Sequence, residues 1–293
     1  MSNRTTLINW LLLMSLVLLW GTSFMFISLS IESLHPLTVV FYRVLIGALI
    51  LTVVVYAKGL KLPFTIQAWL AFLAMGVIGN VLPFFLISWG QLSVNSGIAG
   101  MIMATMPLIT MILAHYLVDG ENLNRYKILG FIFGIGGIAV LLGPVFEGGG
   151  QAAFGGIAIF IAASSYAVNT ILVRRLPKFN PFISTSGVLI AATVVVFPIW
   201  FFVVPTSDTE PSTLALGSTI WLGIGPTAVA TLLLFAVIDR AGPTFLSTIN
   251  YMIPVVAFFT GAYILSESVE WSSLVALAII LSGIALTRFR ANK

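Results

Sequence analysis

Long apolar segments constrain this chain more than any other feature of its sequence. Charged residues, glycine and proline divide it into apolar stretches of about 20 residues, the length of a helix that crosses a bilayer. Helices are expected, because open strand edges cannot lie in lipid and the segments are too long for barrel strands. We expect ten spans, at residues 8–30, 36–57, 66–89, 92–118, 126–143, 153–173, 181–204, 214–238, 244–265 and 271–288.

Charged residues are too few for a soluble protein. They make up 8% of the 293 residues, whereas about 25% is usual in a soluble domain, and 59% of the residues are hydrophobic. Much of the surface must therefore face hydrocarbon. The chain has no cysteine, no nucleotide-binding loop, no hydrolytic triad and no metal-spaced His/Glu cluster. We therefore expect no catalytic residues, no metal and no cofactor.

The basic residues predict how the helices are oriented. With the N-terminus inside, twelve of the 13 Lys and Arg residues fall in the inner segments and none in the outer loops. The thirteenth, Arg43, falls within the second span. This asymmetry is the positive-inside signal, and it places both termini in the cytoplasm. The twelve are Arg4, Lys58, Lys61, Arg125, Lys127, Arg174, Arg175, Lys178, Arg240, Arg288, Arg290 and Lys293.

The second half of the chain repeats the pattern of the first at an offset of roughly 146 residues. Because each half holds five spans, the second half must enter the membrane from the opposite side. We therefore expect two inverted five-helix repeats, residues 1–146 and 147–293. Inverted repeats are typical of alternating-access transporters, but channels also use them. The matching segments are 35–36 with 180–181, 78–80 with 224–226, 106–109 with 253–256, 120–121 with 266–267, and 136–139 with 282–285.

A family resemblance rests on residues in both halves. The first half carries Trp20-Gly21, Arg43, Pro107, Gly120-Glu121 and a Gly-rich fifth span, and the second half carries Pro254, Glu267 and Gly283. This pattern resembles the EamA repeat of the drug/metabolite transporter superfamily, over essentially the whole chain. Within that superfamily it is most similar to the YddG-like exporters of aromatic and other amino acids. The resemblance implies ten helices, a central substrate cavity and export across a bacterial inner membrane.

Arg43 is the one plainly charged side chain well inside a predicted span. Its charge costs about 2.5–3.5 kcal/mol near a helix centre, so Arg43 should face the bundle or a water-filled cavity. It could bind a substrate carboxylate, snorkel outward as an anchor, or tie helices together through backbone carbonyls. No Asp or Glu lies mid-span, which argues against organic cations and a carboxylate proton relay. His115 is the remaining titratable candidate, and we expect an interfacial hydrogen bond there rather than a proton shuttle.

Helix interruptions at matching depths in the two halves predict the substrate site. Proline and glycine free backbone carbonyls, which then need protein, water or substrate as partners. The expected gating or helix-breaking residues are Gly79, Pro83, Pro107, Gly225, Pro226 and Pro254. The expected substrate-binding residues at these depths are Trp20, Arg43, Asn80, Ser164, Tyr166, Asn169, Thr231, Asn250 and Tyr251, with Ser88, Trp89 and Gln91 nearby.

We therefore expect an all-α integral membrane protein that exports neutral, chiefly apolar or aromatic, amino acids and similar metabolites. The expected partners are a small-molecule substrate and membrane lipid, not nucleic acid, and a monomer is the expected state. The alternatives are a passive channel and an exporter of other solutes, such as drugs or purine-like metabolites. A membrane-embedded enzyme or scaffold is disfavoured by the missing catalytic groups and the short loops.

Overall fold

The computed structural model describes residues 3–147, 150–204 and 210–287, which form helices and connecting loops without a strand. Within these residues, eight helical stretches are long and apolar enough to cross a membrane. Two further apolar helices, Ile249–Ile264 and Trp271–Leu286, have 16 residues each. The chain is therefore an all-helical, multi-pass membrane protein.

Several long helices are interrupted within the apolar segment that they span. The first half contains α1 (Asn3–Gly21), α2 (Ser23–Ile31), α3 (Pro36–Ala57), α4 (Ile66–Gly76), the π-helix η1 (Val77–Val81), α5 (Leu82–Gly90), α6 (Ser96–Met103), α7 (Met106–Leu117) and α8 (Arg125–Glu147). The second half contains α9 (Gly150–Arg175), α10 (Pro181–Val203), α11 (Thr213–Leu222), the π-helix η2 (Gly223–Val229), α12 (Ala230–Leu246), α13 (Ile249–Ile264) and α14 (Trp271–Leu286).

Two helices in different halves begin in the same way. The side chains of His35 and Asn180 accept hydrogen bonds from the backbone N–H groups of Leu37 and Phe182, at 3.2 and 3.0 Å. In each case the next residue is proline, whose fixed φ suits the first helical position. The matching dipeptides of the sequence are therefore matching helix starts.

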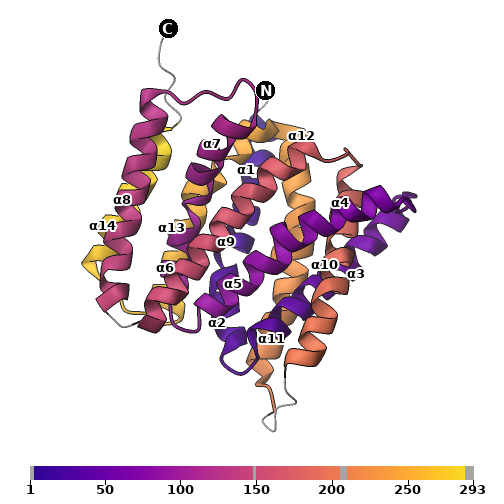
Figure 1. Cartoon of the computed structure of the whole chain (residues 1–293), viewed down its shortest axis with the longest axis horizontal. Helices are drawn as coiled ribbons and strands as arrows, with labels where there is room; N and C mark the ends of the chain where they lie inside the picture. The colour runs from indigo at the N-terminus through magenta and orange to yellow at the C-terminus, as the bar shows by residue number, and fades with distance from the viewer. Residues whose placement is uncertain (1–2, 148–149, 205–209, 288–293) are drawn as a thin grey trace.

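Most of the helices run between two ends of the molecule (Figure 1). At one end α1 and α8 begin and α7, α9 and α12 finish, and Arg174 and Arg240 bond there to Glu121 and Asn9. We call this the basic end. The opposite end, which carries the loops after α2, α5 and α13, is the distal end. Arg288, Arg290 and Lys293, which were also expected at the basic end, lie outside the described residues.

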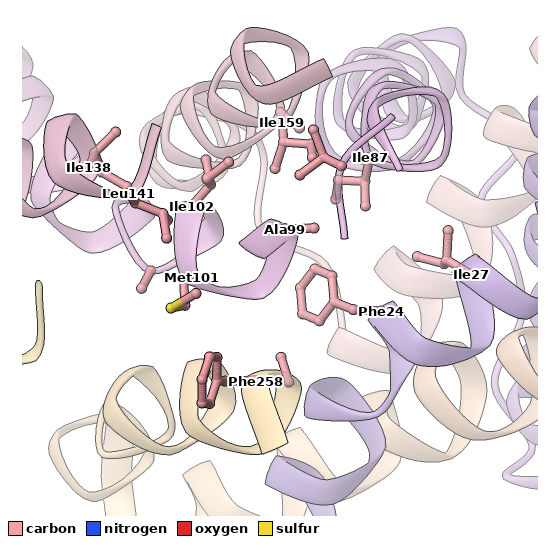
Figure 2. Packing of buried hydrophobic residues seen from close by; sticks show 14 of the residues in the cluster. Phe24, Ile27, Ile87, Ala99, Met101, Ile102, Ile138, Leu141, Ile159 and Phe258 are labelled. Atoms are coloured by element: carbon pink, nitrogen blue, oxygen red, sulfur yellow. The ribbon is translucent and has the colours of Figure 1, made fainter. Parts of the chain in front are cut away.

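A large apolar cluster packs between the helices and reaches the distal end, where Leu34 and Val94 belong to it; Figure 2 shows part of it. The helices that it joins include α2, α5, α6, α9, α11 and α13, and most of its side chains are almost fully buried. The space beside it, next to Phe258 and Glu267, measures about 10 Å³, which is room for one water molecule at most. We call this group the distal cluster; it includes Phe24, Ile27, Ile87, Ala99, Ile102, Ile159, Ala215, Leu222 and Phe258.

Candidate functional site

Two π-helices interrupt the helices that the sequence predicted to be broken. Gly79 and Asn80 lie in η1, with Pro83 at the start of α5 just after it, and Gly225 and Pro226 lie in η2. A π-helical segment shifts the backbone hydrogen bonds out of the α register and occurs frequently at functional sites. Backbone carbonyls in η1 and η2 are consequently available to side chains from other helices.

Each π-helix receives a side-chain hydrogen bond from the other half of the chain. Ser165 Oγ in α9 donates to the carbonyl of Ile78 in η1 at 2.6 Å. Trp20 Nε1 in α1 donates to the carbonyl of Pro226 in η2 at 3.0 Å. Ser164, the neighbour that the sequence singled out, instead donates to Phe160 within its own helix. The two bonds thus tie the interrupted helices into the centre of the bundle.

Asn169 packs directly against η1. A Cβ atom on Gly79 would lie 2.4 Å from Asn169 Nδ2 and 2.6 Å from its Cγ, so only glycine permits this approach. The Asn169 Oδ1 atom is buried and has no hydrogen-bond partner. This amide therefore presents an unused acceptor beside the interrupted helix.

Arg43 is buried between α3, α5 and η2. Its Nε donates to Thr227 Oγ1 at 3.0 Å, and its guanidinium carbon lies 3.8 Å from the centre of the Phe84 ring. Thr227 in turn donates to the carbonyl of Leu222 at 2.8 Å. In the described part of the chain, both ion pairs involve Glu121, so Arg43 has no carboxylate partner there. The result is a central positive charge held by a hydroxyl and an aromatic face.

The other predicted residues take varied positions. The Tyr166 ring stands edge-on to Phe84, with 6.5 Å between ring centres, so it lies next to the Arg43 group. Thr231 Oγ1 bonds the carbonyl of Thr227 in its own helix. The Tyr251 hydroxyl donates to the carbonyl of Ile284 at 3.1 Å and so joins α13 to α14.

The prolines of the fourth and ninth predicted spans are not equivalent in the structure. Pro107 opens α7 directly after the Ala104–Thr105 interruption. By contrast, α13 continues through Pro254, and the chain is interrupted earlier, at Gly242 and at 247–248. Gly242 has a φ of 81°, a left-handed conformation that glycine adopts without strain. The expectation of a helix break at Pro254 is corrected accordingly.

A cavity of about 380 Å³ opens at the basic end, between α7, α8, α9 and α13. Two predicted residues, Pro107 and Asn250, line it. Its remaining walls mix apolar and hydroxyl groups with three charged side chains at the rim. We call it the basic-end cavity; its wall includes Met106, Pro107, Thr110, Met111, Thr170 and Asn250, and its rim Glu121, Lys127 and Arg174.

The rim charges are linked to one another. Glu121 lies 3.9 Å from Lys127 Nζ and 3.6 Å from an Arg174 nitrogen, and its side chain is 42% exposed. Such exposed pairs stabilise little, about 0–1 kcal/mol, so they can separate without great cost. His115 Nδ1 lies 3.0 Å from the carbonyl oxygen of Glu121 and supports the turn that carries the carboxylate. His115 is not among the residues that line the cavity.

Comparison with known proteins gives the family. The model of the EamA-like transporter family matches residues 7–143 and matches again at residues 153–289. The chain belongs to the EamA-like transporter family. As a member, it is a membrane transporter.

Relatives of this EamA-like transporter cover nearly all of it at low identity. The uncharacterized transporter YoaV of Bacillus subtilis is 23% identical over 96% of this chain and 97% of its own length. Protein PagO of Salmonella typhimurium is 23% identical, over 96% and 93%. The uncharacterized inner membrane transporter YedA of Escherichia coli is 24% identical, over 94% and 88%. A crystal structure with 20% identity matches with a TM-score of 0.68 over 96% of each chain, so the two share a fold.

Proposed function

We propose that this EamA-family member is a secondary transporter that exports neutral amino acids, including aromatic ones, and similar small metabolites by alternating access. The observation that carries this proposal is the contrast between the two ends. A cavity of about 380 Å³ opens at the basic end, whereas the pocket beside Phe258 and Glu267 at the distal end measures about 10 Å³. A carrier that exposes its site to one side at a time has such a difference in its inward-open and outward-open states.

The lining of the basic-end cavity supports a small polar substrate. Its volume lies within the range of about 300–1,000 Å³ that is usual for small-molecule sites. Thr110, Thr170 and Asn250 offer uncharged donors and acceptors, and the rim carries both signs of charge. A zwitterion with an apolar side chain matches this combination. Arg43, buried without a carboxylate partner in the described residues, is the proposed contact for the substrate carboxylate deeper in the bundle.

We further propose ten transmembrane helices in two inverted repeats, residues 1–146 and 147–293. The family model matches twice, and the second match begins 146 residues after the first, at 153 against 7. The π-helices η1 and η2 begin at Val77 and Gly223, which are separated by the same number of residues.

Two reciprocal features favour a two-fold relation between the halves. The Trp20–Pro226 and Ser165–Ile78 bonds join the same pair of elements with the halves exchanged: the opening helix of one half and the π-helix of the other. The left-handed residues Gly120 and Ser266 also correspond, and each precedes a glutamate. Because α1 begins at the basic end whereas its counterpart α9 finishes there (Figure 1), the rotation that relates the halves would have its axis in the membrane plane.

The basic end is proposed to face the cytoplasm, with both termini there, in a bacterial inner membrane. The positive-inside asymmetry supports this orientation, and the YedA relative is an inner membrane transporter by name. Single cysteines at Asn122 and Ser268 test it in a chain that has none of its own. An impermeant thiol reagent applied outside should label the second and not the first. Reversed labelling would overturn the orientation.

Transport in liposomes tests the function. Purified protein should show saturable amino-acid uptake and counterflow, whereas a passive channel would show neither. Asn250→Ala should weaken transport by about 1–3 kcal/mol, because a cavity-facing amide loses its hydrogen bonds. The control is His115→Ala, which should leave transport and its pH dependence little changed. Loss of transport in the control with normal transport in Asn250→Ala would contradict the site.

A further inference from the structure

Four polar side chains in the distal half are buried without hydrogen-bond partners. They are Gln91, Ser96, Ser218 and Thr219, each 7% exposed or less. Asn169 beside η1 is the one other described residue that holds such an atom. Buried polar groups are normally paired, so each exception needs an explanation. Their concentration at one end calls for a common explanation.

The helices that carry or adjoin the four groups, α5, α6 and α11, all contact α2, the distal half of the first apolar segment. Ser218 and Thr219 share a face of α11 with Ala215 and Leu222, which belong to the distal cluster together with Ile27 of α2. Gln91 ends α5 and Ser96 begins α6, and α2 contacts α5, α6 and α11. Figure 2 shows Phe24 and Ile27 of α2 facing the side chains of α5 and α6. Separation of these helices from α2 and from α13 would open the distal end around the four groups.

A carboxylate from the loop after α13 holds the α6 side of this region in place. Glu267 Oε1 accepts from the backbone N–H of Ser96 at 2.7 Å, and Oε2 accepts from that of Gly97 at 3.0 Å. An anion at a helix N-terminus is stabilised by the helix dipole and by charge-assisted hydrogen bonds. Gly261 makes room for it, since a Cβ atom there would lie 2.3 Å from Glu267 Oε2. Glu267 thus fastens α6 to α13 across the distal end.

We propose that Gln91, Ser96, Ser218 and Thr219 line the outer half of the substrate pathway, and that Glu267 holds this half closed. The inference rests on the proposed alternating access. In the state that opens at the distal end, the four groups gain water or substrate as partners. None of the four is charged, so they suit uncharged or zwitterionic solutes that are recognised by hydrogen bonds.

Labelling of a single cysteine tests the closure. Thr219→Cys in the cysteine-free chain reports access from the distal side to an impermeant maleimide in liposomes. With Glu267→Gln or Glu267→Ala added, labelling should accelerate about tenfold or more, because one or both charge-assisted bonds are lost. The matched control is Glu270→Gln in the same loop, whose exposed carboxylate accepts from Ser272 and does not touch α6. The control should label like the parent. Unchanged labelling in both Glu267 variants would refute the closure.

A second variant, Thr219→Val, tests whether Thr219 lines the pathway, and its result does not depend on how well the Glu267 variants fold. Thr219→Val replaces an unpaired buried hydroxyl with a methyl group, so it should raise the melting temperature and slow transport by favouring the closed state. An unchanged transport rate would remove Thr219 from the pathway. The substrate proposal fails separately: if no amino acid is transported but Glu267→Gln still opens the distal end, the closure stands alone. If amino acids are transported while labelling is insensitive to Glu267, the closure is wrong and the transport function remains.

Discussion

The contact between Arg43 and Thr227 predicts an unusual pattern of stabilities. Thr227→Val keeps the side-chain shape but removes the acceptor for Arg43 Nε, which lies 3.0 Å away, and the donor for Leu222. Hydrogen bonds to charged groups contribute about 1.5–3 kcal/mol, and the buried guanidinium has no substitute partner among the described carboxylates. The single variant should therefore be less stable by about that amount.

The other half of the chain suggests how the loss can be repaired. At the offset of 146 residues, Arg43 corresponds to Leu189 and Thr227 to Val81, and both of these are buried in one apolar cluster. The double variant Arg43→Leu/Thr227→Val replaces the hydrogen-bonded pair with the leucine and valine that occupy the corresponding positions in the other half. It forfeits the hydrogen bond and a desolvated cation–π contact of about 2 kcal/mol, but it regains about 2.5–3.5 kcal/mol from removing the membrane-buried charge. Its net cost should be about 0–2.5 kcal/mol, no more than that of the single variant.

Unfolding in mixed micelles, followed by the fluorescence of the seven tryptophans, measures both changes. Thr231→Val is the matched control, because that hydroxyl bonds the Thr227 carbonyl within its own helix, and it should change stability by less than about 0.5 kcal/mol. If Thr227→Val equals this control, the inter-half bond stabilises nothing. Transport separates the two roles of Arg43: a stable double variant that still carries amino acids would make Arg43 a structural tie and remove it from the substrate site.

Two further predictions concern η1 and the start of α3. Gly79→Ala should lower the free energy of unfolding by about 1–3 kcal/mol, because the added methyl group clashes with Asn169. Adding Asn169→Ala to the same chain should restore most of this loss. The control Gly136→Ala, at a position with open space around it, should leave the free energy of unfolding unchanged or raise it. Partial burial lowers the pKa of His35, so the folded protein resists its protonation. The stability of the parent should be full above the pKa of the unfolded chain and should decline as the pH falls below about 6.5. Thermal melts measure this decline. The variant His35→Asn, which keeps an N-cap side chain but does not titrate, should lack it.

The membrane class was predictable from the sequence, because apolar length and scarce charge act through simple transfer energetics. The predicted span 36–57 coincides with α3, where a proline and a lysine mark the ends. The fourth and ninth segments were less accurate, since hydropathy measures apolar length and does not detect internal interruptions. The breaks at 104–105 and at 247–248 lie inside the predicted spans and depend on local backbone geometry, whereas Gly242 lies in the short link between the eighth and ninth spans.

Partners of the π-helices were harder to predict than their positions. Glycine and proline mark η1 and η2 because they permit the geometry, but they do not say which side chain bonds the freed carbonyl. Ser165 bonds η1, whereas its neighbour Ser164, which was predicted to bind substrate, bonds within its own helix; successive residues point about 100° apart around a helix. Thr227 was missed for a similar reason, although it directly follows Pro226. Each polar residue next to a predicted helix interruption should therefore be considered as a candidate partner of the freed carbonyl.

Duplication explains why backbone features recur in this chain while side-chain chemistry differs. The π-helices and the left-handed residues 120 and 266 correspond, because both halves must bend in the same places to pack together. Nothing in that requirement fixes the side chains at the bends. Arg43 and Leu189 occupy corresponding positions, and so do Glu121, which pairs with rim cations, and Glu267, which caps α6. Under the proposed alternating access, the two halves need a shared backbone geometry, but export moves the substrate in one preferred direction. The positions at which the halves differ in charge or hydrogen bonding are therefore the first places to seek the residues that set specificity and direction.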